Sequence, residues 1–374
     1  MRIVIAPQEF KGSLTAIEAS HAIASGVRAA LPGAEIIEVP MSDGGPGLVD
    51  AMLAARGGTR IETDVHDPLM RPVRAGWALL GAGEPRTAAI EMAAASGLVL
   101  LLPAERDPLV ATTYGTGELI RAALDRGCEQ IIVGVGGSAT VDGGAGAIQA
   151  LGVRLLDAGG SDLAPGGASL ARLDRIDIAA RDARLARAVI RVASDVTNTL
   201  CGPAGAAAMF GPQKGASQAD VQALEAALRR FARIAERDCG VDMLGLRGGG
   251  AAGGLAAGLA AVAGATIEPG FDLVAAAAGL EATIAAADVV ITGEGRLDAQ
   301  TKYGKTVSGV AALARKYGTK VAVIAGSVDA TYDASSGDFD IVESVLQPGM
   351  SAEDAMRDAN AHVVTAAQRV ARRL

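Results

Sequence analysis

The segment Ile131–Gly146 reads IIVGVGGSATVDGGAG and guides how the rest of the chain is interpreted. Its apolar beginning, residues 131–135, is typical of a buried strand, and the residues that follow form a loop with little side-chain bulk. Glycines let backbone N–H groups approach an anion closely, and hydroxyl groups add donors. We therefore expect the loop to cradle phosphates, with Asp142 holding a divalent cation that neutralises them. The phosphate-binding residues would be Gly136, Gly137, Ser138 and Thr140.

A glycine-rich turn that only packs tightly remains the alternative for this loop. Other segments argue against that alternative, because loops that combine glycine with a carboxylate recur along the chain, each after an apolar run. Examples follow the apolar runs that end near Val39, Ala193 and Thr292. The recurrence favours a site built from several loops.

Composition excludes some classes of function. The 374 residues carry 34 basic and 42 acidic side chains, a net charge of −8, without a long run of either sign. This balance and an aromatic content of 3% argue against nucleic acid as a partner. No apolar run reaches the roughly 18 residues that would span a membrane, so we expect a soluble, cytoplasmic protein. Three scattered cysteines and three histidines leave carboxylates, lysines and backbone amides as the groups for chemistry.

The order of predicted elements indicates an α/β fold. Strands near Ile3 and Ile36 flank a helix over residues 15–31, which is typical of a parallel sheet covered by helices. Residues 61–95 contain short runs with Pro and Gly turns, which suggest an antiparallel excursion, and the stretch from the central loop to about residue 286 reads as irregular. Six strands complete the predicted sheet, and they start near Ile3, Ile36, Ile131, Asp288, Lys320 and Asp340.

This pattern predicts two domains. Residues 1–60, 113–141 and 286–374 would form a mostly parallel α/β domain, and residues 61–112 and 142–285 a second α/β domain inserted in it. Ligands of such sheets bind beyond the carboxyl ends of the strands. We therefore expect the site in a cleft between the two domains, with the inserted domain as its opposing wall.

Charged residues follow the first two strands. Lys11 in the sequence FKGS could contact a phosphate or a substrate carboxylate as a point charge, although a solvated surface lysine is the alternative. Asp43 lies on a glycine turn, where it is either a turn residue or a ligand for a metal or a substrate hydroxyl.

Two later loops add candidate catalytic groups. Asp195 follows an apolar run and could act as a general base or a Mg²⁺ ligand, and Lys214 in FGPQKGA could contact phosphate; a turn residue is the alternative for Asp195. In ITGEGRLD, Arg296 offers a bidentate fork for an anion, whereas Glu294 and Asp298 could hold a cation. A surface loop with paired charges is the alternative there.

A dinucleotide-binding fingerprint is a different interpretation of the central loop. Gly134, Gly136 and Ala139 satisfy a loose G-x-G-x-x-A spacing, and Asp157 follows at roughly the expected distance. An oxidoreductase of that class would need a helix directly after the strand, and the residues from Asp142 to Gly146 are a poor first helical turn.

The ordered motifs FKGS, DGG, IEMAAASGL, GVGGSAT, DVTN, FGPQKGA, GAAGG and ITGEGRLDAQT resemble those of the bacterial glycerate kinase family, of the ATP-dependent glycerate 2-kinase type. The resemblance extends from residue 2 to about residue 369. It implies a flavodoxin-like domain with a second α/β domain inserted in it. It also implies Mg²⁺-ATP as the phosphoryl donor and D-glycerate as the acceptor, with 2-phosphoglycerate as the expected product.

The resemblance places these charged residues at motif positions that line the cleft, and physical reasoning suggests a role for each. Asp195 would be the base that orients the substrate hydroxyl, and Arg296 or Lys11 would clamp the glycerate carboxylate. Asp142, Glu294 and Asp298 would serve the metal. The other expected acceptor contacts are Ser13, Asp43 and Arg71, and the other expected nucleotide contacts are Lys214, Gly253 and Gly254.

This chain also departs from the family pattern inside the matching loops. Gln8 and Glu9 stand where the family has Asp-Ser, Pro46 replaces Glu, Val141 replaces Asn and Thr199 replaces Pro. Lost polar groups change substrate discrimination by orders of magnitude, so another small hydroxy acid remains an alternative acceptor. The other interpretation of these departures is that they are neutral exchanges, which leave the choice of acceptor unchanged. The sequence leaves the position of the transferred phosphate and the oligomeric state open, with a homodimer as one option.

Overall fold

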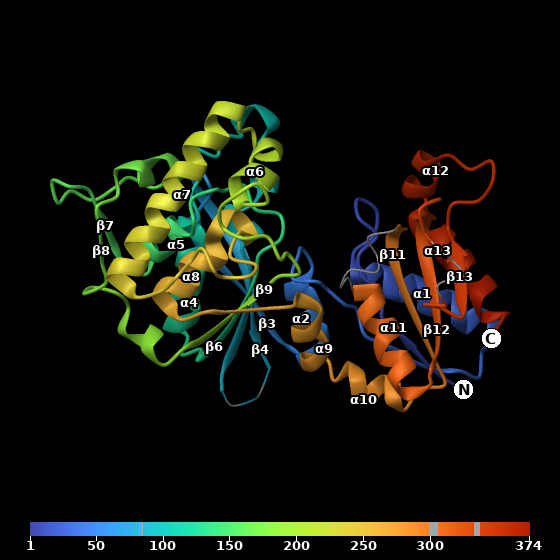
Figure 1. The fold of residues 1–374 in the computed structure, drawn as a ribbon. Coiled ribbons are helices and arrows are strands. Elements are labelled where there is room, and N and C mark those ends of the chain that lie inside the picture. The colour runs from blue at the N-terminus through green and yellow to red at the C-terminus, as the bar shows by residue number, and fades with distance from the viewer. Residues whose placement is uncertain (82, 84, 299–305, 333–336) are drawn as a thin grey trace. The chain divides into compact units, whose positions relative to one another are not determined.

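The computed structural model describes residues 1–374 except 82, 84, 299–305 and 333–336 (Figure 1). The chain divides into two compact units. Unit 1 comprises residues 1–43, 50–57 and 271–374, and unit 2 comprises residues 44–49 and 58–270. Within the described residues, no helix combines the length and the apolar character needed to cross a membrane.

Unit 1 is built on a parallel sheet in the order β13-β12-β11-β1-β2. Every pairing in this sheet is parallel. When the strands of unit 1 alone are numbered along the chain, the order is 2-1-3-4-5, which is the flavodoxin-like order. The predicted fold class is thus confirmed. The strands are β1 (Arg2–Ile5), β2 (Glu35–Glu38), β11 (Val289–Leu297), β12 (Lys320–Val328) and β13 (Ile341–Ser344).

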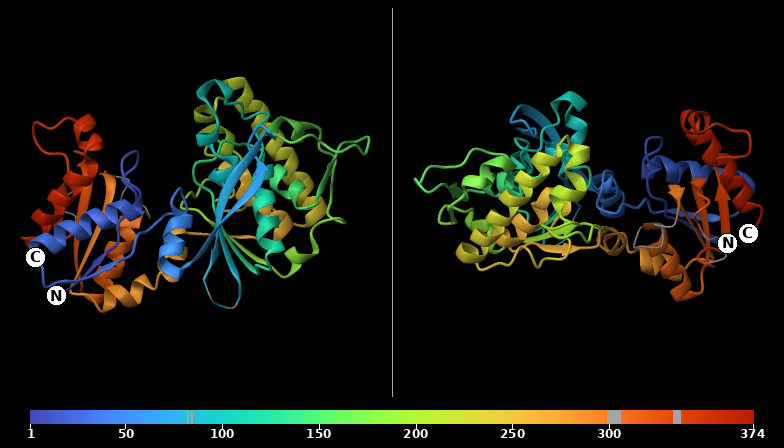
Figure 2. Two further views of the ribbon diagram at one scale, coloured as in Figure 1. Left: turned by 180° about the vertical axis from the view of Figure 1, so that it is seen from behind. Right: turned by 45° about the horizontal axis from the view of Figure 1, so that its top comes forward.

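Helices cover both faces of this sheet (Figure 2). On one face, α1 (Ala16–Ala30) and α13 (Ala359–Ala371) pack on apolar side chains that include Ile3 and Ile291. On the other face lies α11 (Thr306–Tyr317). The helix α1 begins at a capping box, in which the Thr15 hydroxyl accepts from the Glu18 N–H and the Glu18 carboxylate accepts from the Thr15 N–H. The remaining helices are α2 (Leu48–Arg56), α9 (Gly270–Ala277), α10 (Leu280–Ala285) and α12 (Ala352–Arg357).

Unit 2 contains a mixed sheet in the order β10-β9-β6-β5-β4-β3. Its first four strands are parallel to one another, and the β3–β4–β5 pairings are antiparallel. The antiparallel excursion predicted for residues 61–95 is confirmed. The strands are β3 (Gly58–His66), β4 (Pro72–Leu80), β5 (Thr87–Glu91), β6 (Gln130–Gly134), β9 (Val189–Ala193) and β10 (Thr266–Glu268).

The strand before the glycine-rich loop lies in a different sheet from the one predicted. β6 pairs with β5 on one side and β9 on the other, with Ile131 opposite Ala88 and Ile190. Both of its edges are therefore occupied within unit 2. The sheet of unit 1 has five described strands instead of the predicted six, and residues 113–141 lie in unit 2.

The stretch that was expected to be irregular contains regular structure. The longest helix, α7 (Gln218–Cys239), starts at a capping box formed by Ser217 and Asp220 and ends at Gly240, whose φ of 73° suits glycine. Residues 271–285 belong to unit 1 and not to the insertion. The other elements of unit 2 are α3 (Ala93–Ser96), α4 (Tyr114–Asp125), α5 (Ala145–Ala150), α6 (Ala206–Phe210), α8 (Leu255–Ala263), β7 (Arg154–Leu156) and β8 (Arg175–Asp177).

Candidate functional site

A cavity lies at the carboxyl ends of four strands of unit 1. It has a volume of about 140 Å³, and Lys11 and Ser13 after β1, Gly295 of β11 and Ser327 of β12 contribute to its wall. The strand order reverses direction between β1 and β11, and ligands of doubly wound sheets bind beside such a reversal. The structure therefore brings the expected site residues Lys11 and Ser13 together at the position where the fold favours a ligand.

The loop after β1 also contacts the loop after β2. Nε2 of Gln8 donates to Oδ2 of Asp43 over 3.0 Å. Burial and the charge of Asp43 raise the pKa of Glu9, while Lys11 opposes this shift. Two of the residues that depart from the family pattern, Gln8 and Glu9, thus interact with the expected acceptor contact Asp43.

The third group of expected residues lies on and after β11. The Glu294 side chain is 7% exposed, and Arg296 points outward with an ion pair to Asp329. That ion pair and hydrogen bonds from Thr331 lower the pKa of Asp329 to about 2, with the Thr331 bonds the larger cause. Arg296 is therefore held by Asp329 in this structure, and contact with a substrate carboxylate would compete with that ion pair. Asp298 is half-buried. The family motif continues at residues 299–301, which lie outside the described residues.

In unit 2 the glycine-rich loop after β6 is largely buried. Gly136 and Gly137 are at least partly exposed, whereas Ser138 and Thr140 are buried. Gly253 allows a close approach of two backbones, because a Cβ there would lie 1.9 Å from the carbonyl oxygen of Thr140. Gly254 is packed in the same way against Gly143. In this structure Gly253 and Gly254 allow one loop to pack closely on another, and their expected contact with the nucleotide stays a prediction. Phosphate binding by Gly136 and Gly137 stays a prediction.

Lys214 is inside unit 2 and not on its surface. The side chain is fully buried, and its ammonium donates to Oγ of Ser138 over 2.6 Å and to the carbonyl oxygen of Thr140 over 2.7 Å. Burial lowers the pKa of Lys214 to about 7, although the charge of Asp142 acts in the opposite direction. The lysine that was expected to contact phosphate thus holds the glycine-rich loop in place from the interior of unit 2.

Asp142 has an internal role as well. Its carboxylate is completely buried, and it accepts hydrogen bonds from the backbone N–H groups of Thr113, Gly144 and Gly146 and from the Thr113 hydroxyl. Burial is the main cause that raises its pKa, and these hydrogen bonds oppose it. In this structure the Asp142 carboxylate anchors the loop through these hydrogen bonds, and its expected role as a metal ligand stays a prediction.

Asp195 lies directly beyond β9. Oδ1 of Asp195 accepts from the backbone N–H of Gly270 over 2.8 Å, which connects the ends of the parallel strands β9 and β10. The residue is half-buried. This position at a carboxyl strand end agrees with the placement expected from the sequence, and the role of Asp195 as a base stays a prediction.

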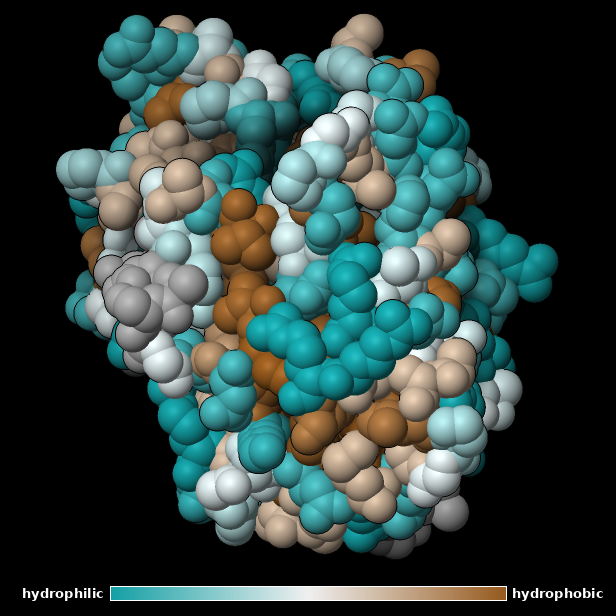
Figure 3. All heavy atoms as spheres, turned by 90° about the vertical axis from the view of Figure 1, so that its right-hand side faces the viewer, coloured by the Kyte–Doolittle hydropathy of each residue, from teal (hydrophilic) through white to brown (hydrophobic). Residues whose placement is uncertain are grey.

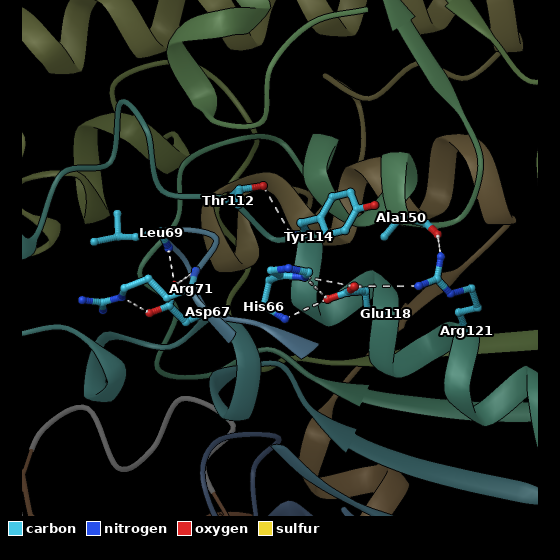
Figure 4. A network of polar contacts seen from close by, with 9 residues as sticks. All are labelled: His66, Asp67, Leu69, Arg71, Thr112, Tyr114, Glu118, Arg121 and Ala150. Carbon is cyan, nitrogen blue, oxygen red and sulfur yellow. Dashed lines mark hydrogen bonds and ion pairs between the residues drawn. The ribbon is translucent and has the colours of Figure 1, made fainter. Parts of the chain in front are cut away.

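A polar network at the end of β3 was not predicted (Figure 4). The carboxylate of Glu118 accepts a hydrogen bond from the backbone N–H of His66 over 2.8 Å. It also lies 3.0 Å from Nδ1 of the His66 ring. The rings of Tyr114 and His66 pack edge to face, with 6.0 Å between their centroids. The available signal was a rare histidine at the end of an alternating apolar run, directly before Asp67 and Pro68.

Arg71 belongs to the neighbouring turn. Its Nε donates to Asp67 over 2.6 Å, one terminal nitrogen donates to Glu105 over 2.7 Å, and the other donates to the carbonyl oxygen of Leu100. The guanidinium therefore connects the turn after β3 to the segment 98–105. This clamp uses the groups with which Arg71 was expected to bind a substrate.

The dinucleotide-binding interpretation does not match the local structure. After β6 the next helix along the chain, α5, begins only at Ala145, so the helix that a dinucleotide-binding loop needs does not start at the residues from Gly136 to Ala139. The strand β7 near Asp157 pairs antiparallel with β8 and joins neither large sheet. Among the described residues, no group of three or more His, Cys, Asp or Glu side chains is arranged to hold a metal ion.

Comparisons with known proteins agree along the whole length. A model of the glycerate kinase family matches residues 3–374. The chain is 46% identical over 372 residues to a glycerate kinase of Bacillus subtilis, covering 99% of this chain and 97% of that protein. It is also 46% identical over 372 residues to the glycerate 2-kinase of Escherichia coli, with the same coverage. A crystal structure from Salmonella typhimurium LT2, provisionally named glycerate kinase 2, is 49% identical and superposes with a TM-score of 0.89 over 100% of this chain and 98% of that one. The chain belongs to the glycerate kinase family.

Proposed function

We propose that the protein is an ATP-dependent glycerate kinase that transfers the γ-phosphoryl group to a hydroxyl of D-glycerate and forms 2-phosphoglycerate. The observation that carries this proposal is the 46% identity to a protein named glycerate 2-kinase over 99% of the chain. Phosphoryl transfer needs positioning and charge neutralisation more than covalent chemistry. An array of lysine, arginine, carboxylates and backbone amides is suited to that task.

In unit 1, Lys11 and Arg296 would serve the anionic groups of the reactants. Lys11 is exposed beside the cavity at the strand ends, and Arg296 would exchange its ion pair with Asp329 for a substrate carboxylate or phosphate. Asp43 would accept a hydrogen bond from a hydroxyl of the acceptor. Its hydrogen bond with Gln8 fixes the orientation of the carboxylate before the acceptor arrives.

In unit 2, Asp195 would be the general base that accepts the proton of the attacking hydroxyl. The Gly270 N–H holds Oδ1 of the carboxylate and thus sets its direction. Gly136 and Gly137 would contribute backbone N–H groups to phosphate. Lys214 and Asp142 would support these groups from the interior without touching the nucleotide.

Mg²⁺ would supply charge neutralisation on the phosphates. Sites for Mg²⁺ that accompany a nucleotide need only one or two protein carboxylates, and the phosphates and waters complete the shell. Either Glu294, near the carboxyl end of β11, or Asp298, directly after it, could supply such a carboxylate. The donor set of hard oxygens fits the ion.

The test is to incubate the protein with Mg²⁺-ATP and D-glycerate, to couple ADP release to an optical readout, and to identify the product by phosphorus NMR. Formation of 2-phosphoglycerate supports the proposal. ATP consumption that does not depend on D-glycerate would contradict it, and a signal of the 3-phosphate would correct the position of transfer.

A second candidate is a kinase for another small hydroxy acid. The hydrogen bond from Gln8 to Asp43 favours it, because an amide donor stands where the family has a carboxylate. A panel of 2-hydroxy and 2,3-dihydroxy acids, compared by kcat/KM, separates the two candidates. A homodimer is not part of the proposal, because the comparisons do not support one.

A further inference from the structure

The cavity of unit 1 has an apolar interior that the acceptor does not explain. Its wall is formed mainly by Phe10 of the loop after β1, by Val345 and Leu346 after β13, and by side chains of α12 and of the start of α13. The helix residues are Ala352, Ala355, Met356, Ala359 and Val363. D-Glycerate carries a carboxylate and two hydroxyls on three carbons, and burial of such groups against apolar side chains is unfavourable.

We propose that this cavity binds the adenine ring of ATP. The inference rests on the proposed kinase function and assigns the part of unit 1 that recognises the nucleotide base. The cavity volume of about 140 Å³ is suited to one flat ring system, since an apolar cavity of about 150 Å³ in another protein accepts benzene.

The polar groups of the cavity lie where the rest of the nucleotide would leave it. Lys11, Ser13 and Ser327 are the polar side chains of its wall; Lys11 and Ser13 lie in the loop after β1, and Ser327 lies at the carboxyl end of β12. The cavity also adjoins the reversal of strand order between β1 and β11, where Gly295 and the backbone of Lys11 approach each other. A base in the apolar part would therefore direct its ribose and phosphates toward a lysine.

The wall formed by α12 can adapt to a ring. Met356 is 50% exposed although it lines the cavity, and methionine adjusts its shape readily and makes favourable contacts with aromatic rings. A methyl group at Gly12 would lie 3.1 Å from the terminal carbon of Met356, so the loop after β1 and α12 close the cavity together. Figure 3 shows the face of the molecule on the side of unit 1, where apolar side chains are exposed in a furrow among polar ones.

The experiment compares Ala355→Phe, which fills the cavity, with Ala361→Phe, which makes the same change on an exposed position of α13 outside the cavity. We measure the Kd of ATP by calorimetry, the KM of ATP and of D-glycerate, and the thermal shift given by adenosine alone. Ala355→Phe is expected to weaken the binding of ATP by at least about tenfold. It should also abolish the thermal shift given by adenosine and leave the KM of D-glycerate unchanged. Ala361→Phe should behave like the wild type.

A second variant keeps the test decisive if Ala355→Phe does not fold. Met356→Glu introduces a charge at an exposed position of the cavity wall and should also weaken the binding of ATP and of adenosine. Unchanged ATP affinity in folded variants would overturn the inference, as would a raised KM for D-glycerate with normal ATP affinity, which would assign the cavity to the acceptor. The adenosine measurement needs no acceptor. Loss of adenosine binding in a protein that does not phosphorylate D-glycerate would therefore reject the proposed function and still support the cavity assignment.

Discussion

Nε2 of Gln8 donates a hydrogen bond of 3.0 Å to Oδ2 of Asp43. The two residues follow β1 and β2, so this bond joins two neighbouring strand ends of unit 1. Glu9 lies beside the pair, and burial together with the Asp43 charge raises its pKa. A donor at position 8 therefore reduces the repulsion that a third carboxylate would create.

The first prediction concerns Gln8→Glu, which keeps the size of the side chain and removes the donor. We expect kcat/KM for the acceptor to fall at pH 8 and to recover as the pH decreases, because protonation of one carboxylate restores a donor between positions 8 and 43. The measurement is a pH–rate profile from pH 5 to 9. Gln8→Leu is the control, because leucine cannot titrate and the decrease in its kcat/KM for the acceptor should not depend on pH in this way. Identical profiles for Gln8→Glu and the wild type would contradict the role of this hydrogen bond.

The second prediction concerns Lys214, whose pKa is lowered to about 7 mainly by burial. In the unfolded chain the ammonium titrates near pH 10.4. Between these two values the unfolded state binds more protons, so the free energy of unfolding gains a contribution that increases with pH from about 7 to about 10. Lys214→Met should remove this contribution, which denaturant unfolding at several pH values would reveal.

The same substitution leaves two buried acceptors, Ser138 Oγ and the Thr140 carbonyl, without the lysine donor. The cost of such a loss is about 1–3 kcal/mol, and we expect a lower unfolding midpoint at pH 7. Lys320→Met on an exposed position of β12 is the matched control. Equal pH dependence of stability in wild type and Lys214→Met would show that the buried ammonium does not titrate in this range.

The sequence predicted those parts of the fold that depend on local signals. The helix α1 has a capping residue at Thr15 and a proline at position 32, and the strands of unit 1 lie at five of the six predicted strand positions. The sheet that contains β6 was not predictable from its apolar run, because a buried parallel strand has the same pattern in either sheet. Only the pairing of Ile131 with Ala88 and Ile190 assigns it.

For the site residues, too, local signals were predictable from the sequence and contacts between distant residues were not. Positions after strands, such as Lys11 and Asp195, were predicted because the carboxyl ends of parallel strands attract functional groups. The internal roles of Lys214 and Asp142 depend on partners far along the chain, such as Ser138 for Lys214 and Thr113 for Asp142. No local pattern encodes such contacts, so their burial could not be inferred from glycine spacing.

The third prediction concerns the clamp formed by Arg71. Arg71→Gln removes its contacts to Asp67, Glu105 and the Leu100 carbonyl, and we expect faster hydrogen exchange over residues 98–105. The ion pair with Glu105 is exposed, whereas Asp67 is buried, so we expect only a small decrease in the global unfolding midpoint. Arg71→Lys is the comparison, because lysine keeps the charge and loses the planar fork. A raised KM for D-glycerate without faster exchange would instead identify Arg71 as an acceptor contact.

The fourth prediction concerns the proposed base. Asp195→Asn retains an oxygen that can accept from the Gly270 N–H at the position of Oδ1, so the loop should keep its structure while the proton acceptor is lost. General base catalysis contributes about 10²–10⁴-fold, and we expect kcat to fall by a factor in that range with the Kd of ATP unchanged. Asp272→Asn, on an exposed position of α9, is the matched control. Normal turnover of a folded Asp195→Asn variant would exclude Asp195 as the base, whereas a parallel loss of ATP affinity would indicate that its carboxylate serves the nucleotide instead.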